Sequence, residues 1–186
     1  MSYVSDLREK VGHDYPLQLP GTGIIVWRKN RGGGIELLLQ LRTDVGKYGL
    51  LGGGIELGES YKECAIRELE EEAGLKTHKS ALCLLKVYAG SAHISVYENG
   101  DVVYHTVVVY SLDYDYTTDT YTSLSSETKA LKWMPLGEIK NLLREDAEKH
   151  FFHNNIPIFW DIVNKFFCWG AWKRGGAKAS SLEHFI

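Results

Sequence analysis

The chain has 186 residues, of which 44% are hydrophobic and 24% are charged, a composition typical of a folded globular domain and not of a disordered chain. Its formal net charge is −3, from 21 Lys and Arg against 24 Asp and Glu, which excludes a broad cationic surface for DNA or for acidic membranes. An anionic substrate would therefore need a metal ion or a few local cations.

The length fits one domain with short appendages. We expect a single domain over residues 1–172, with helical extensions at both ends, and a flexible polar tail over residues 173–186. Neither a spanning apolar run nor a signal-peptide core is visible, so a cytoplasmic protein is expected. The cysteines Cys64, Cys83 and Cys168 have neither disulfide nor zinc spacing and are expected to be reduced packing residues.

The first part of the chain predicts a short helix and a hairpin. Residues 4–11 have a weak helical pattern, and a loop that carries Pro16 and Pro20 follows. Two apolar, β-prone runs at Gly23–Arg28 and Ile35–Arg42 predict antiparallel strands. Three consecutive glycines lie between them. A phosphate cradle would lead into a helix, whereas a strand follows here, so we expect a flexible turn.

The middle and the end of the chain alternate between helical and strand patterns. Glu59–Ala73 has an apolar stripe at helical spacing, with Gly74 as a natural stop. Further strands are predicted at Ala81–Tyr88, Ala92–Tyr97, Val102–Tyr110 and Lys129–Met134, and further helices at Gly137–Lys149 and Ile156–Phe167. Strands on both sides of a helix, followed by terminal helices, favour an α/β fold with a mixed sheet covered by helices.

The acidic residues of the first long helix share one side of it. With Leu69 as the buried direction and about 100° per residue, Glu72 lies about 60°, Glu68 about 100° and Glu71 about 160° around the same side. Glu70 lies on the opposite flank. Like charges at this spacing destabilise a helix unless something neutralises them. An exposed acidic face is the alternative, but a set of oxygen ligands alone favours magnesium or manganese bound with substrate phosphates.

The segment Gly53–Leu75 resembles the Nudix box, G-x5-E-x7-R-E-U-x-E-E-x-G-U, in which U is aliphatic. Every defined position is matched, by Gly53, Glu59, Arg67, Glu68, Leu69, Glu71, Glu72, Gly74 and Leu75. The resemblance implies a Nudix-type α/β/α sandwich. It also implies a pyrophosphohydrolase that depends on Mg²⁺, with Mn²⁺ as a substitute. Such an enzyme cleaves the diphosphate linkage of a nucleoside diphosphate derivative by attack of water at phosphorus.

The resemblance also implies roles for single residues. Glu68, Glu71 and Glu72 are the expected catalytic metal ligands, with the backbone carbonyl of Gly52 as a further ligand. Family members differ over which glutamate deprotonates water, so Glu68 has a shared ligand or base role. Glu70 is expected to be an ordinary surface residue.

Other residues of the box are expected to shape the site. Glu59 and Arg67 should pair and hold the loop on the helix, while Gly53 and Gly74 permit close approach and end the helix. Leu51 stands where relatives commonly have proline, which changes loop rigidity but removes no chemical group.

Outside the box, the candidates are weaker. Glu127, in the loop before the late strand, is a candidate catalytic residue, because some relatives place a metal ligand or base there; a surface acid is the alternative. Tyr48 and Trp133 are candidates for stacking on a substrate base, and Arg42 for contact with phosphate, with ordinary packing as the alternative for each. The aromatic residues after 150 would cover the sheet or form a homodimer contact.

Two other functions remain open within the same resemblance. A non-catalytic nucleotide-sensing module would not need the complete acidic set. An RNA 5′-end pyrophosphohydrolase would need a basic track, which the acidic balance does not indicate. A small-molecule nucleoside diphosphate derivative is therefore the expected substrate.

Overall fold

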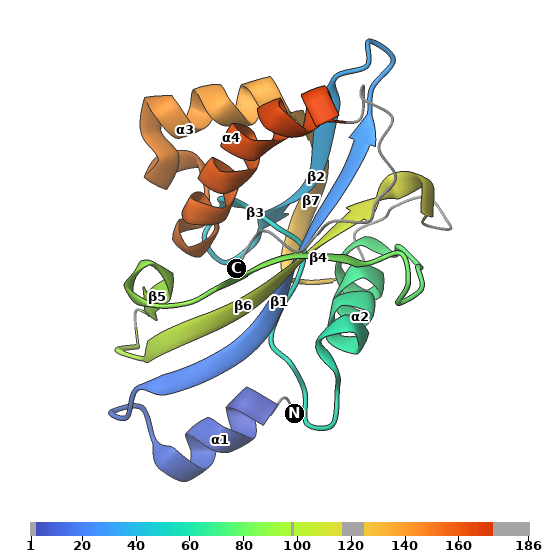
Figure 1. Cartoon of the computed structure of the whole chain (residues 1–186). Helices are drawn as coiled ribbons and strands as arrows, with labels where there is room; N and C mark the ends of the chain where they lie inside the picture. The colour runs from blue at the N-terminus through green and yellow to red at the C-terminus, as the bar shows by residue number, and fades with distance from the viewer. Residues whose placement is uncertain (1–2, 98, 117–124, 173–186) are drawn as a thin grey trace.

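The computed structural model describes residues 3–97, 99–116 and 125–172, with only the backbone described beyond residue 164 (Figure 1). Its helices are α1 (Tyr3–Val11), α2 (Tyr61–Ala73), α3 (Leu136–His150) and α4 (Ile156–Trp172). Its strands are β1 (Leu17–Lys29), β2 (Ile35–Arg42), β3 (Tyr48–Gly49), β4 (Cys83–Tyr88), β5 (Ile94–Val96), β6 (Val102–Asp113) and β7 (Thr128–Pro135). Three short 3-10 helices are also present, η1 (Ser91–His93), η2 (Tyr114–Tyr116) and η3 (His153–Asn155).

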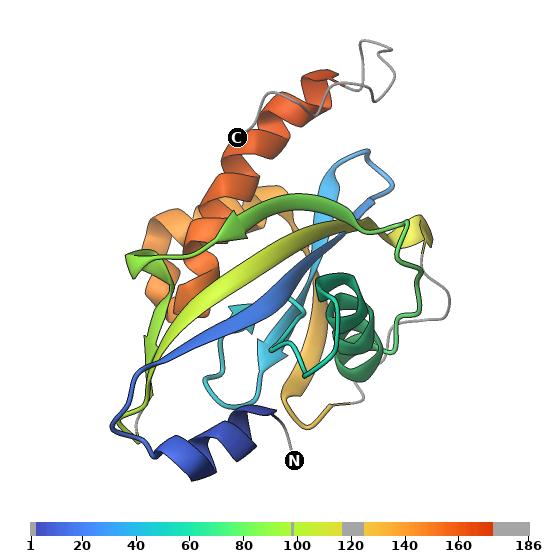
Figure 2. The ribbon, with the colours of Figure 1, turned by 60° about the horizontal axis from the view of Figure 1, so that its bottom comes forward.

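The strands form one mixed seven-stranded sheet in the order β3-β2-β1-β6-β4, with β5 beside β6 and β7 beside β2. The central pair β1 and β6 is parallel, and the other pairs are antiparallel. Helix α2 covers one face of the sheet, and α3 and α4 cover the other (Figures 1 and 2). The predicted α/β class and the α/β/α sandwich with a mixed sheet are therefore confirmed.

Each face of the sheet has its own apolar core, because the central strands are buried on both sides. Ile24, Val26 and Leu38 pack with Leu69 under α2. Ile25, Leu37 and Leu39 alternate with them and pack under α3 and α4. This period-2 alternation explains the continuous apolar runs in the sequence.

Strand β1 begins earlier than predicted, since the expected loop around Pro20 is part of it. Residues Leu17 to Trp27 pair in parallel with β6. Thr22 N and Ile24 N donate to the loop before α2, at Gly53 O and Leu51 O, so these even-numbered residues turn their amides away from β6. Pro20 lies in the same phase, and its carbonyl accepts from Ile55 N at 3.2 Å. Its missing N–H therefore costs no hydrogen bond to β6.

The other predicted elements are present, with shifted ends. The short strand β3 was not predicted, because two residues are too few to show a strand pattern. The triple glycine forms a turn in which Gly32 N and Gly34 N donate to the Asn30 side chain, as expected for a turn and not for a phosphate cradle. Cys64 is buried as expected, but Cys83 is exposed because it lies on the edge strand β4.

The aromatic C-terminal segment covers the sheet in part. Phe151 and Phe159 are fully buried, with ring centroids 4.8 Å apart, in the core under α3 and α4. The side chains beyond residue 164 and the predicted tail over residues 173–186 lie outside the described part of the chain. None of the described helices is long and apolar enough to cross a membrane.

Candidate active site

Helix α2 carries most of the candidate site, and both its ends are held by specific caps. At its start, the Ser60 side chain accepts from Glu63 N while the Glu63 carboxylate accepts from Ser60 N at 2.8 Å. This capping box satisfies amides that have no partner within the helix. At its end, Gly74 adopts a left-handed conformation (φ 66°), and its N–H donates to Glu70 O at 2.9 Å. The glutamates between these caps therefore stand on a well-defined helix.

Glu72 is the most buried of the helix glutamates, with 4% of the residue exposed. Its carboxylate accepts from Gly52 N at 2.7 Å and from Gln40 Nε2 at 2.9 Å. Burial is the main reason that the pKa of Glu72 rises to about 8, and the charge of Glu68 adds to it, although the two hydrogen bonds oppose the rise. Glu72 is thus held in place by two donors from the sheet side of the site.

Gln40 was missed by the sequence interpretation, although it orients Glu72. It is 1% exposed and is itself fixed, because its Nε2 also donates to Leu50 O at 2.9 Å and its Oε1 accepts from Thr128 Oγ1 at 2.9 Å. The sequence feature that could have revealed it is the amide side chain of Gln40 directly after the apolar run Leu37–Leu39, in a strand that is buried on both faces. A buried polar side chain in such a strand needs a polar partner across the core.

Glu68 and Glu71 both face the guanidinium of Arg67. Arg67 Nη1 donates to Glu68 Oε1 at 2.8 Å and to Glu71 Oε2 at 3.1 Å. The side chain of Glu68 is 12% exposed and that of Glu71 is 57% exposed. Burial raises the pKa of Glu68; Arg67 opposes this, and the charges of Glu71 and Glu127 add to it.

Arg67 also joins the loop to the helix, in the pairing that the box resemblance implies. Its Nε donates to Glu59 Oε1 at 2.7 Å, and its Nη2 donates to Glu59 Oε2 at 3.1 Å and to Gly54 O at 2.9 Å. This bidentate contact lowers the pKa of Glu59 and raises that of Arg67. The loop and the glutamates therefore share one cation.

Two glycines before α2 allow the loop to lie against the sheet and the glutamates. A Cβ on Gly53 would lie 2.4 Å from Glu68 Oε1, and a Cβ on Gly52 would lie 2.3 Å from Thr22 O. Gly52 also has a φ of 136°, which side chains rarely permit. Gly52, predicted through its carbonyl, thus also contributes the N–H that holds Glu72.

Glu127 and Arg42 extend the charged cluster beyond the box. Glu127 O accepts from Thr43 N at 2.9 Å, which brings the start of β7 beside the end of β2. Burial lowers the pKa of Arg42, but the carboxylates of Asp44, Glu72 and Glu127 raise it by more. Arg42 donates to Asp44 at 2.7 and 3.0 Å. A firmly held cation thus lies close to the glutamates.

The two candidate stacking residues lie on opposite faces of the sheet. Trp133 pairs with Leu38 of β2 and shares the α2 face, where the Arg28 guanidinium lies 4.1 Å from its ring centroid. Tyr48 pairs with Leu41 and packs against the core under α3 and α4. The structure therefore does not bring Tyr48 and Trp133 together as one platform, since neighbouring residues of a strand alternate in direction.

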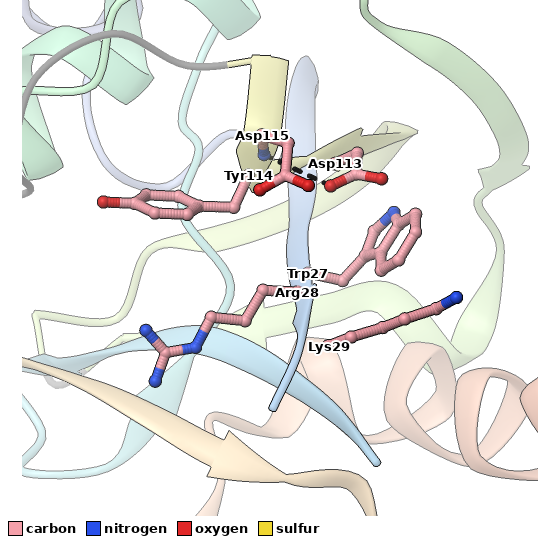
Figure 3. Close-up of a pocket in the computed structure, with 6 residues that line it drawn as sticks. All are labelled: Trp27, Arg28, Lys29, Asp113, Tyr114 and Asp115. Atoms are coloured by element: carbon pink, nitrogen blue, oxygen red, sulfur yellow. Dashed lines mark hydrogen bonds between the residues drawn. The ribbon is translucent and has the colours of Figure 1, made fainter. Parts of the chain in front are cut away.

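A cavity of about 220 Å³ lies where the end of β1 meets the turn after β6 (Figure 3). It is lined by Trp27, Arg28, Lys29, Asp113, Tyr114 and Asp115. None of the glutamates Glu68, Glu71, Glu72 and Glu127 is among the lining residues. Arg28 and Tyr114 of the lining instead contact the ring of Trp133.

Comparison with known proteins identifies the family. The model of the NUDIX domain matches residues 17–154, which is well over half of the chain. The chain belongs to the Nudix hydrolase family. As a Nudix hydrolase, it is an enzyme that acts on phosphoanhydride bonds.

Solved structures with the same fold come from several bacteria. A MutT protein from Bacillus halodurans is 21% identical with a TM-score of 0.58, covering 78% of this chain and 82% of its own. The NUDIX domain of Shewanella oneidensis NrtR, solved with ADP-ribose, is 18% identical with a TM-score of 0.55, covering 76% and 88%. A MutT NUDIX hydrolase from Burkholderia pseudomallei is 24% identical with a TM-score of 0.52, covering 65% and 85%. At these identities the likeness shows the shared fold.

The donor set of this Nudix hydrolase suits a hard divalent cation in its chemistry. Glu68, Glu71, Glu72 and Glu127 offer carboxylate oxygens. Burial first, and then the charges of Glu71 and Glu127, raise the pKa of Glu68, and burial and the charge of Glu68 raise the pKa of Glu72. Such accumulated negative charge is what a bound dication neutralises. Within residues 3–97, 99–116 and 125–172, no three acidic, histidine or cysteine side chains already converge as a complete metal-binding group. Glu68 and Glu71 instead both contact Arg67.

Proposed function

We propose that this Nudix hydrolase is a Mg²⁺-dependent pyrophosphohydrolase that cleaves the diphosphate linkage of a nucleoside diphosphate derivative. The observation that carries the proposal is the placement of three glutamates on one side of α2, where Arg67 contacts Glu68 and Glu71 and Gly52 N holds Glu72. The contact of Thr43 N with Glu127 O brings Glu127 and Arg42 to the same end of β2. A diphosphate needs counter-charge on its oxygens, and its attack by water needs a proton acceptor. This cluster offers both.

In this mechanism the carboxylates of Glu68, Glu71 and Glu72 and the carbonyl of Gly52 would hold Mg²⁺, or Mn²⁺ in its place. When bound there, the cation would supply counter-charge to the diphosphate and would lower the pKa of water. Glu68 or Glu127 accepts the proton of the attacking water. The new bond joins the water oxygen to phosphorus, and the bond from phosphorus to the bridging oxygen breaks to release a phosphate-bearing product. Arg42 contacts a phosphate oxygen, and Trp133 contacts the substrate on the α2 face.

The two alternatives remain less well supported. A non-catalytic nucleotide-sensing module has no need for a buried and hydrogen-bonded Glu72 together with Glu68 and Glu71. An RNA 5′-end pyrophosphohydrolase would be favoured by a basic track, and the net charge of −3 does not supply one. The ADP-ribose in the Shewanella structure supports a nucleotide derivative as the substrate class.

The test is a substrate panel assayed with Mg²⁺, with Mn²⁺ and after chelation. The panel contains nucleoside triphosphates, ADP-ribose, dinucleoside polyphosphates, NADH, sugar nucleotides and capped RNA. We expect hydrolysis of a nucleoside diphosphate derivative, loss of turnover on chelation and recovery with Mg²⁺. Circular dichroism should remain unchanged on chelation, because apolar burial and not the metal holds the fold. Binding of a nucleotide without turnover would instead favour the sensing module.

We also propose that the chain forms a homodimer through the sheet edge made by β4 and β5. This edge exposes apolar side chains, with Leu84 55% exposed, Val87 51% and Val96 71%. Strand β4 pairs only with β6 among the described strands, so it forms an edge of the described sheet, the place where a strand of another chain can be added. A second copy related by a twofold axis presents the same edge in antiparallel orientation.

A further inference from the structure

Helix α1 lies outside the segment that the family model matches, residues 17–154, and it docks beside the loop that leads into α2 (Figures 1 and 2). We call residues 52–60 the box loop. Helix α1 thus lies outside the matched domain but next to the loop that precedes the helix glutamates.

The first residue of α1 is joined to the box loop by a hydrogen bond. Tyr3 N donates to Glu56 Oε2 at 3.0 Å. The first amides of a helix have no partner within it, and the positive end of the helix dipole favours a nearby carboxylate. Glu56 therefore satisfies the start of α1 from a distant part of the chain, 53 residues away.

The other half of α1 is anchored to the sheet by Arg8, which is 8% exposed. Its Nη1 donates to Gly12 O at 3.0 Å and to Tyr15 O at 2.7 Å, which fixes the end of the helix. Its Nε lies 3.3 Å from Asp101 Oδ1, just before β6. Asp101 also contacts His13 Nδ1 at 2.9 Å. Helix α1 is therefore held between the sheet and the box loop.

Glu56 continues this connection to the candidate catalytic residues. Its N–H donates to Glu59 Oε2 at 2.9 Å, and Glu59 N donates to Glu56 O at 3.1 Å. Glu59 in turn accepts from Arg67, and Arg67 donates to Glu68 Oε1 at 2.8 Å. A continuous series of hydrogen bonds thus runs from the start of α1 to a glutamate of the proposed metal site.

We propose that α1 is a brace that positions the box loop, with Glu56 as the positioning residue at which the brace acts. This inference rests on the proposed hydrolase function for its effect on catalysis. Without the brace, the box loop samples more conformations, and Glu59 and Arg67 hold Glu68 in its reactive position for a smaller fraction of the time.

The test uses pairs of matched variants of the full chain. Tyr3→Pro removes the N–H donor while proline remains compatible with the first turn of a helix, and Tyr3→Ala keeps the donor. Arg8→Met removes the anchor, and Lys10→Met changes an exposed cation of the same helix. Hydrogen exchange of box-loop amides should be about tenfold faster in Tyr3→Pro and Arg8→Met than in their controls, the factor expected for one hydrogen bond to a charged group.

Kinetics provide the second readout. In Tyr3→Pro, kcat should fall several-fold while KM changes little, because the substrate contacts are intact. Glu56→Ala should reproduce the loss, and Glu56→Gln should restore part of it by keeping an oxygen acceptor. If Arg8→Met fails to fold, the comparison of Tyr3→Pro with Tyr3→Ala still tests whether α1 positions the box loop.

Equal box-loop exchange in Tyr3→Pro and Tyr3→Ala would overturn the brace. If the enzyme is active but the exchange rates are equal, the proposed function is supported and the role of α1 as a brace is refuted. Conversely, if no substrate of the panel is hydrolysed but exchange responds as expected, the brace stands and the proposed function fails.

Discussion

Glu70 and Glu71 are adjacent in the sequence but have different surroundings on α2. Glu71 contacts Arg67 at 3.1 Å beside Glu68, whereas the Glu70 carboxylate lies 3.8 Å from Lys76 on the exposed flank. An exposed pair of that kind contributes little to stability. Side-chain direction on the helix, and not acidity, therefore distinguishes a proposed metal ligand from a surface residue.

Glu71→Gln is expected to lower kcat by about 100-fold or more, the scale for loss of one charged group that stabilises a phosphoryl transition state. The amide keeps the shape of the side chain, so the melting temperature should change little. Glu70→Gln is the matched control and should retain nearly full kcat. Similar losses in both variants, measured by steady-state kinetics with Mg²⁺, would contradict the assignment of the helix faces.

At the scale of elements, a cluster of partly buried histidines around the buried Ser95 joins β5 and β6 to η3. Ser95 Oγ lies 2.9 Å from His105 Nε2 and 3.2 Å from His153 Nε2, and it accepts from Asn154 Nδ2 at 2.7 Å. Burial, followed by the charges of His153 and His93, lowers the pKa of His105 to about 4. The surroundings of His105 therefore favour its neutral form.

This shift predicts that acid weakens the fold between about pH 6.5 and pH 4. The unfolded chain protonates His105 near its ordinary pKa of 6.5, while the folded chain resists protonation until about pH 4. The free energy of unfolding, measured by urea titration at pH 7 and pH 5, should thus fall less for His105→Gln than for the wild type. His78→Gln, at an exposed site, is the control.

Glu72 acts in the opposite sense, because its pKa is raised and its stabilising protonated form is lost as pH rises toward about 8. The change in unfolding free energy between pH 7 and pH 5 is therefore compared between His105→Gln, His78→Gln and the wild type, because Glu72 contributes equally to all three. Identical pH dependence of unfolding in His105→Gln and His78→Gln would refute the role of the cluster.

At the scale of the whole molecule, the edge formed by β4 and β5 predicts the oligomeric state. Light scattering coupled to gel filtration should give twice the mass of the chain for the wild type and a single mass for Val87→Lys. Val45→Lys, at a residue 44% exposed elsewhere on the surface, should remain dimeric. A wild-type protein that stays monomeric at all concentrations would refute the dimer.

The amino-acid sequence by itself determined the α/β class, the place and the C-terminal end of α2 and the direction of its glutamates, although the helix begins two residues later than the predicted Glu59, after the Ser60 cap. These features are local: the period of a helix, a cap and a glycine stop are all encoded within a few neighbouring residues. The same holds for the β1–β2 hairpin, whose turn and alternation are adjacent in the chain. The early start of β1 was not predictable, because Pro20 is acceptable only where its nitrogen faces away from β6.

Only the tertiary structure decided which distant residues join the helix glutamates. Gln40 and Arg42 reach them from β2, Glu127 comes from the start of β7, and Glu56 is bound by Tyr3 N. The separation of Tyr48 from Trp133 likewise depends on strand register. The physical reason is that register follows from the packing of both faces of the sheet at once, and a shift of one residue turns every side chain to the other face.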